Sequence, residues 1–148
     1  MPRIALSLTI PIALLILAVP SLPGEGGLFS VSGEVAFSGT APLYLELVER
    51  NEFDGNLRSP FGLVLRPTAE DASRGRAAFS FQSVPPGIYG IRSFQDTNGT
   101  GKLETGLFGP KEPWGMYRPC RPALRGPRFD EISFIVDRDL SGLSFPVE

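Results

Sequence analysis

Two amino acids on which enzymes rely are scarce in this chain of 148 residues: histidine is absent, and cysteine occurs once. The absence of histidine removes the commonest general base and the commonest transition-metal ligand. Cys120 consequently has no histidine to activate it as a nucleophile, and the sequence contains no Gly-x-Ser-x-Gly motif. A pair of carboxylates of the kind that a glycosidase uses could come from among Glu104, Glu112, Asp130 and Glu131, but any surface with 16 acidic residues offers such pairs. The sequence therefore predicts a protein that is not an enzyme.

The single cysteine also excludes a disulfide framework within the chain, so the fold must depend on its hydrophobic core. The formal net charge of −2 is mildly acidic, which argues against a nucleic-acid partner and against adsorption to anionic lipid. The 15 prolines would interrupt most long helices. No internal repeat or low-complexity linker divides the chain, and we expect one domain.

The N-terminal segment has the composition of a targeting sequence. Arg3 supplies a short positive region, and Ile4–Val19 is almost wholly apolar. A membrane-spanning helix needs about 20 apolar residues, and this run is shorter and contains Pro11. The pattern predicts a cleaved signal peptide over residues 1–24, with an uncleaved N-terminal anchor as the alternative. Residues 25–148 would then be exported to the periplasm, the cell surface or the medium, without stable membrane insertion.

The rest of the sequence is patterned like an all-β protein. Short segments in which apolar and polar side chains alternate are separated by clusters of Gly, Pro, Asn and Asp. Seven such segments are expected to contain strands: Phe29–Phe37, Pro42–Arg50, Phe61–Arg66, Ala77–Val84, Gly87–Phe94, Asp130–Asp137 and Leu140–Val147. The one candidate for a helix is the charged run Thr68–Arg74.

This spacing predicts a two-sheet sandwich of about seven strands, Ig-like or transthyretin-like. Its core is expected to contain Phe79, Phe81, Ile88, Phe134, Ile135 or Val136, and Phe145.

The segment VPPGIYGIRSF, which begins at Val84, predicts a hairpin. Pro85 and Pro86 stiffen the turn, Gly87 allows a positive φ, and Tyr89 returns the chain to the sheet. The order of aromatic strand, Pro-Pro-Gly-x-Tyr and strand resembles transthyretin-like and carboxypeptidase-regulatory-like sandwiches.

The residues that follow make the resemblance more specific. FQDTNGTGKLETGLFGPKEPWG, from Phe94, and RGPRFDEISFIV, from Arg125, resemble the bacterial exported family known as domain of unknown function 2141. The resemblance extends from about Phe79 to the C-terminus. It departs from the family pattern at Tyr117–Pro122, which replaces a small Asn-rich stretch, and Asn51–Arg76 is not diagnostic of any family. The resemblance implies a secreted β-sandwich and transfers no activity.

The loop Asp96–Glu104 is a candidate calcium site. Calcium loops place oxygen ligands at positions 1, 3 and 5 and a backbone carbonyl at position 7. The corresponding residues, with a carboxylate at position 9, are Asp96, Asn98, Thr100, Lys102 and Glu104. The position that supplies a bidentate carboxylate in an EF-hand is Leu107, so affinity would be millimolar at best unless Glu112 or Asp130 completes the site.

The alternative for this loop is purely structural. Asn98-Gly99 and Thr100-Gly101 would form consecutive tight turns. The Asp96 carboxylate would then accept backbone N–H groups near Asn98 to Thr100.

A second candidate site follows the loop and would bind a ligand. Three aromatic residues would form a flat platform for a sugar or peptide, and neighbouring charged residues would form its rim. The platform and rim residues are Phe108, Glu112, Trp114, Tyr117, Arg118 and Arg121. In the alternative, the aromatic residues cover an open end of the sandwich and the arginines pair with nearby carboxylates.

Two functions follow from these features. The first is a non-catalytic binding or accessory module that uses Gly106–Arg128 against a cell-envelope protein, peptide or glycan. The second is a structural domain in which Ca²⁺ orders the loop Asp96–Glu104. The oligomeric state is left open by the sequence.

Overall fold

The computed structural model describes residues 26–148, so the predicted signal peptide lies outside the described residues. The elements, in chain order, are β1 (Phe29–Ala36), β2 (Leu43–Val48), α1 (Arg50–Asp54), β3 (Phe61–Leu65), α2 (Ala69–Arg74), β4 (Arg76–Val84), β5 (Gly87–Gln95), β6 (Thr105–Gly106), β7 (Gly109–Pro110), β8 (Trp114–Met116), α3 (Phe129–Ile132), β9 (Phe134–Val136) and β10 (Leu140–Pro146).

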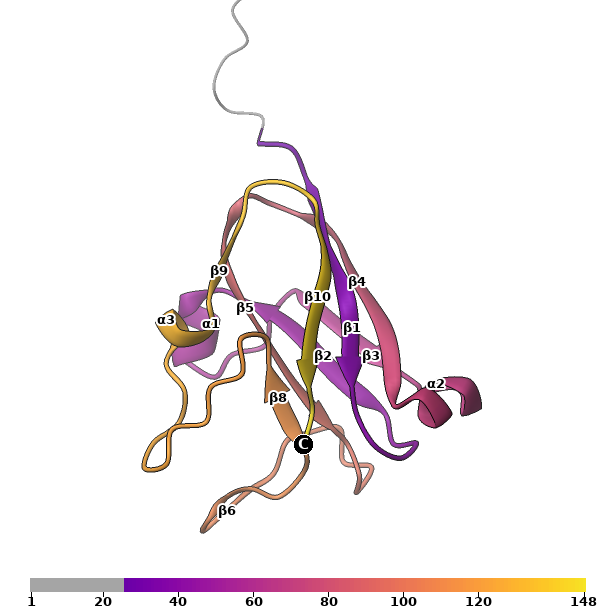
Figure 1. Ribbon diagram of the computed structural model, residues 1–148. Coiled ribbons are helices and arrows are strands. Elements are labelled where there is room, and N and C mark those ends of the chain that lie inside the picture. The colour runs from indigo at the N-terminus through magenta and orange to yellow at the C-terminus, as the bar shows by residue number, and fades with distance from the viewer. Residues whose placement is uncertain (1–25) are drawn as a thin grey trace, which may run out of the picture.

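The strands form the predicted all-β sandwich of two main sheets (Figure 1). One sheet has the order β10-β1-β4, in which β1 and β10 are parallel. The other has the order β3-β2-β5-β8, and β9 pairs with the first residues of β5. Each of the seven predicted segments contains a strand. The three further strands β6, β7 and β8 all lie in the long segment between β5 and α3.

The hydrophobic core lies between the two sheets because alternate side chains of each strand point inward. On β2, Leu43, Leu45 and Leu47 are fully buried. The core contains Val31, Val35, Phe37, Leu43, Leu45, Leu47, Ala77, Phe79, Phe81, Val84, Tyr89, Ile91, Phe134, Val136, Leu143, Phe145 and Val147. The predicted core residues Phe79, Phe81, Phe134, Val136 and Phe145 are among them.

The prediction was wrong for Ile88, whose side chain is 56% exposed. Strand β5 directs Tyr89 and Ile91 into the core, so Ile88 points to the outer face. There it lies opposite Ile135 of β9, which is 64% exposed. Apolar residues occur on both faces of β5, and alternation alone therefore could not choose the buried face.

The Pro-Pro-Gly turn differs from the prediction in one respect. The positive φ falls on Ser83, at 57°, and not on Gly87. Gly87 instead makes room for an aromatic ring, because a Cβ atom there would lie 2.9 Å from Cε2 of Tyr89. The glycine is thus required by side-chain packing.

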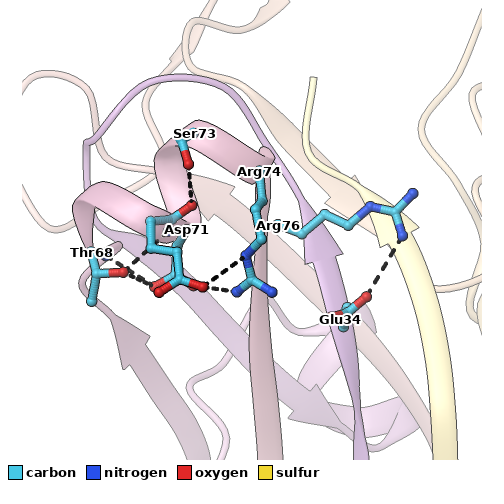
Figure 2. A network of polar contacts seen from close by, with 7 residues as sticks. Glu34, Thr68, Asp71, Ser73, Arg74 and Arg76 are labelled. Carbon is cyan, nitrogen blue, oxygen red and sulfur yellow. Dashed lines mark hydrogen bonds and ion pairs between the residues drawn. The ribbon is translucent and has the colours of Figure 1, made fainter.

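Helix α2 occurs where it was predicted (Figure 2). The Thr68 hydroxyl accepts the Asp71 N–H at 3.1 Å, and the Asp71 carboxylate accepts the Thr68 N–H at 3.0 Å. These reciprocal bonds form a capping box, and Gly75, with φ of 64°, ends the helix. The hydrogen bonds from Thr68 and then Arg74 lower the pKa of the Asp71 carboxyl group.

Helices α1 and α3 were not predicted. Residues 130–132 were expected to be part of a strand, but they belong to α3. The ring centroids of Phe53 and Phe129 are 5.9 Å apart, and the Arg50 guanidinium lies 4.9 Å from the Phe129 ring centroid. Ile132 packs on Gly90, where a Cβ atom would lie 2.7 Å from its Cδ1. The two helices therefore cover the outer face of β5 at Gly90 (Figure 1).

Candidate functional site

The long connection from β5 to β8 is held at its start by Asp96, which is only 5% exposed. Its Oδ1 accepts the Thr100 N–H at 3.0 Å, and its Oδ2 accepts the Gly101 N–H at 3.0 Å. Gly99 and Gly101 have φ values of 73° and 68°, which let the chain turn around the carboxylate. The predicted orientation of Asp96 toward its own loop is confirmed.

A second buried carboxylate, Glu112, holds the other end of the connection and is 4% exposed. Its Oε1 accepts the Thr97 N–H at 3.1 Å, and its Oε2 accepts the Glu104 N–H at 3.3 Å. A buried carboxylate is stable only when such donors replace its water. Glu112 therefore ties the two halves of the connection together. Its hydrogen bonds come from backbone amides, so it is not one of the carboxylates that were expected to pair with arginine.

The hairpin β6–β7 stands between these two anchors. Lys111 donates its N–H to the Glu104 carbonyl at 2.8 Å, and Thr105 and Gly106 pair with Pro110 and Gly109. The turn consists of Leu107 and Phe108, which are 94% and 100% exposed. Figure 1 shows the hairpin at the lower end of the sandwich, away from the sheets. We call Leu107 and Phe108 the hairpin tip.

The other predicted metal ligands are engaged in hydrogen bonds within the loop. Asn98 Oδ1 accepts both the N–H and the hydroxyl of Thr100, at 3.1 and 2.8 Å. The carbonyl of Lys102 accepts the same hydroxyl at 3.2 Å. The Glu104 carboxylate lies 3.5 Å from the Lys111 ammonium. Within residues 26–148, no three His, Cys, Asp or Glu residues group in a way that could hold a metal ion. The described geometry is that of a loop closed by its own donors and acceptors.

The predicted aromatic platform is divided among different places. Phe108 is at the hairpin tip, whereas the Tyr117 ring packs edge-on against Phe134, with centroids 5.2 Å apart. The Arg121 guanidinium lies 4.4 Å from the Trp114 ring centroid and donates to the carbonyls of Trp114 and Glu148. Trp114 is thus covered by Arg121.

The remaining charged residues of this region mainly hold the backbone in place. Arg118, which has a positive φ of 56°, donates to the Ser133 carbonyl at 2.9 Å. Arg125 binds Glu131 at 2.6 Å, and this bond, with the Arg128 N–H, lowers the pKa of Glu131 to about 2. Burial and the nearby Glu131 raise the pKa of the Cys120 thiol, which disfavours the reactive thiolate.

An aromatic row that was not predicted from the sequence lies on the outer face of the larger sheet. Tyr44, Phe94 and Trp114 are directly opposite one another on β2, β5 and β8. The Tyr44 and Phe94 rings stack with centroids 4.9 Å apart and an interplanar angle of 9°. Gly101 lies against Tyr44, since a Cβ atom there would be 3.4 Å from the hydroxyl. The row therefore supports the loop that Asp96 closes. In the sequence, the only sign of this row is that Tyr44 and Phe94 alternate with the inward-facing residues of β2 and β5.

Shallow depressions lie beside the exposed pair Ile88 and Ile135. The larger has a volume of about 610 Å³ and the smaller about 440 Å³, and both include Ile88, Asp130 and Ser133. The larger one extends between β9 and β10, where Tyr117, Phe134, Ile135, Leu140 and Leu143 contribute to its lining. We call the larger depression the β9–β10 groove.

The model of the family described as "Uncharacterized protein conserved in bacteria (DUF2141)" matches residues 42–141. The chain belongs to this family. The match begins well before Phe79, where the sequence resemblance became recognisable, so β2 and β3 are part of the family domain. The hairpin tip and both anchoring carboxylates also lie inside the matched segment. No curated protein and no solved structure matches the chain. Among the residues that the structure describes, no helix is long and apolar enough to span a bilayer.

Proposed function

We propose that this member of the family is a non-catalytic binding module that is exported and acts outside the cytoplasm, and that the hairpin tip is its contact element. The observation that supports this most directly is the exposure of Leu107 and Phe108, at 94% and 100%. Single exposed apolar side chains are common on soluble proteins, but adjacent ones at the end of a projecting hairpin have no role in the core. Such residues contribute most to the stability of a complex, when a partner covers them and removes their apolar surface from water.

The anchoring of the hairpin supports a protein partner. The carboxylates of Asp96 and Glu112 hold the connection through four backbone amides. A preorganised contact element loses less conformational entropy on binding. A phenylalanine with a leucine neighbour is suited to a concave apolar pocket.

A glycan is a weaker candidate for the tip. Sugar recognition uses exposed ring faces together with polar side chains that bind hydroxyl groups. The residues beside the tip are Gly106, Gly109 and Pro110, which have no polar side chains. Trp114, which was predicted to be part of a platform for a sugar or peptide, is already covered by Arg121.

Site-specific photo-crosslinking in the host tests this function. A photoreactive amino acid is placed at position 108 and, as a matched control, at the exposed Leu57 beyond α1. We expect position 108 to give a discrete protein adduct that position 57 does not give, and Leu107→Ser to reduce its yield. If position 108 gives no adduct, or only the adducts seen at position 57, the hairpin tip is not a contact element.

A further inference from the structure

Asn98 and Gly99 form the only asparagine–glycine pair in the chain, and both are exposed in the loop that Asp96 closes. We propose that Asn98 is a site of spontaneous modification, at which the side-chain amide is lost through a cyclic imide formed with the backbone nitrogen of Gly99. The product is a mixture of aspartate and isoaspartate at position 98. This inference does not depend on the proposed function, because it concerns the covalent chemistry of the loop and not its partner.

The reaction consumes only water. The Gly99 nitrogen loses its proton and attacks Cγ of Asn98, so that a new N–Cγ bond closes the cyclic imide. The Cγ–Nδ2 bond breaks, and Nδ2 takes up a proton and leaves as ammonia. Water then opens the imide at one of its two carbonyl groups. Aspartate forms when the original peptide bond is kept, and isoaspartate forms when the main chain continues through Cγ.

The Gly99 nitrogen, which is the nucleophile, is unhindered. The two anchoring carboxylates accept four other amides of the loop, and in the part of the chain that the structure describes the Gly99 N–H donates to no acceptor. Glycine also has no side chain to obstruct the attack. A Cβ atom at this position, where φ is 73°, would meet no other atom within 4 Å. Water can therefore enter, and ammonia can leave, without any movement of the fold.

The Asn98 side chain is activated by Thr100. Attack on Cγ moves negative charge onto Oδ1, which already accepts the Thr100 hydroxyl at 2.8 Å and the Thr100 N–H at 3.1 Å. Donors that stand where charge develops stabilise a tetrahedral intermediate, as in an oxyanion hole. The bond from the N–H also closes a ring that contains both reacting atoms, Cγ of Asn98 and the nitrogen of Gly99, and so keeps them near each other.

The hydroxyl is the donor that can be tested separately. The Thr100 N–H is shared with Asp96, whose Oδ1 accepts it at 3.0 Å. The hydroxyl lies nearer to Asn98 Oδ1 than to its other acceptor, the Lys102 carbonyl at 3.2 Å. Removal of the hydroxyl therefore weakens the stabilisation of the intermediate and leaves the bonds from Asp96 to the backbone in place.

The other two asparagines of the chain lack this arrangement and are internal controls. Asn56 is followed by Leu57, whose N–H already donates to the Glu52 carbonyl at 2.8 Å. Asn51 lies in α1 and is followed by Glu52. In both cases the next residue has a side chain that obstructs attack on the asparagine Cγ. We therefore expect Asn98 to be the fastest of the three sites.

The two products affect the loop differently. Aspartate keeps an oxygen at the position of Oδ1, so the variant Asn98→Asp should retain the turn. Isoaspartate adds a methylene group to the main chain between Asp96 and Thr100, whose hydrogen bond fixes the size of the loop. We expect purified isoaspartyl protein to melt at a lower temperature than Asn98→Asp.

Peptide mapping by mass spectrometry tests the proposal on the protein as its host processes it. The protein is incubated at neutral pH, either folded or unfolded in urea, and isoaspartate is labelled with an isoaspartyl methyltransferase. We expect Asn98 to convert at least as fast in the folded protein as in urea, with Asn51 and Asn56 largely intact when folded. Thr100→Val should slow the conversion about two- to tenfold, the contribution of one hydrogen bond, whereas Thr100→Ser should match the parent.

Three results would overturn the proposal: an Asn98 that stays intact, an Asn98 that reacts faster in urea than in the folded protein, or a Thr100→Val variant that reacts as fast as the parent or faster. The last result would show that the bonds from Thr100 protect the amide. The comparison of folded and unfolded parent needs no variant, so it decides the question even if Thr100→Val is unstable. Isoaspartyl protein that melts like Asn98→Asp would refute the effect on the loop.

Discussion

Replacing Asp96 by alanine removes the acceptor of two backbone N–H groups, those of Thr100 and Gly101. The Thr100 N–H keeps a partner, because Asn98 Oδ1 also accepts it at 3.1 Å. The Gly101 N–H loses its carboxylate acceptor. A hydrogen bond to a charged group contributes about 1.5–3 kcal/mol, and water can reach part of this exposed loop. We therefore expect a loss of about 1–2 kcal/mol in the free energy of unfolding.

For a domain of this size, that loss corresponds to a decrease of roughly 3–10 °C in the melting temperature. The assay is thermal and urea unfolding in the presence of a chelator. Asp137→Ala is the matched control, because that carboxylate is exposed and only 3.6 Å from the adjacent Arg138, an arrangement with little effect on stability. If Asp96→Ala unfolds like the control in chelator, the carboxylate does not hold the loop and the reasoning is refuted.

Four further predictions concern other parts of the chain. Gly115→Ala should cost at least about 3 kcal/mol, since its Cβ would lie 1.9 Å from the Pro146 carbonyl oxygen, whereas Gly62→Ala, with open space around it, should unfold almost like the parent. The Glu131 pKa of about 2 lies below its ordinary value of 4.5, so its contribution to stability is present above pH 4.5 and is lost as the pH falls toward 2. Urea midpoints should fall less steeply over that range in Glu131→Gln; an unchanged slope would contradict the assignment. Millimolar Ca²⁺ should leave the melting temperature unchanged relative to chelator, because the loop closes through its own N–H groups; a clear rise would favour the calcium-stabilised domain. Protein recovered from its host should lack roughly the first 20–24 residues, and an intact N-terminus in the cytoplasm would refute export.

Much of the local structure could be predicted from the sequence because it depends on neighbouring residues. Alternation placed Phe79 and Phe81 on one face of β4, where both are buried. The charged run Thr68–Arg74 predicted a short helix, and the structure shows α2 there, begun by a capping box between Thr68 and Asp71. Asp96 was predicted to cap its own loop because its short side chain reaches amides only a few positions away.

The candidate site depended on contacts between distant residues. Glu112 was expected to be a rim residue of the ligand platform or to complete a calcium site, but it is buried, and its Oε1 accepts the N–H of Thr97, 15 positions earlier in the chain. Leu107 and Phe108 are 94% and 100% exposed because they form the turn of a hairpin that projects from between these two anchoring carboxylates.

The sequence by itself determined seven segments that contain strands, all outside the long connection from β5 to α3, since the period-two pattern follows from the geometry of an extended chain. The tertiary structure decided which face of β5 is buried. Tyr89 fills the core, while Ile132 covers Gly90 and Ile135 pairs with the exposed Ile88. These contacts join residues more than 40 positions apart, and their energy depends on packing that only the folded chain creates.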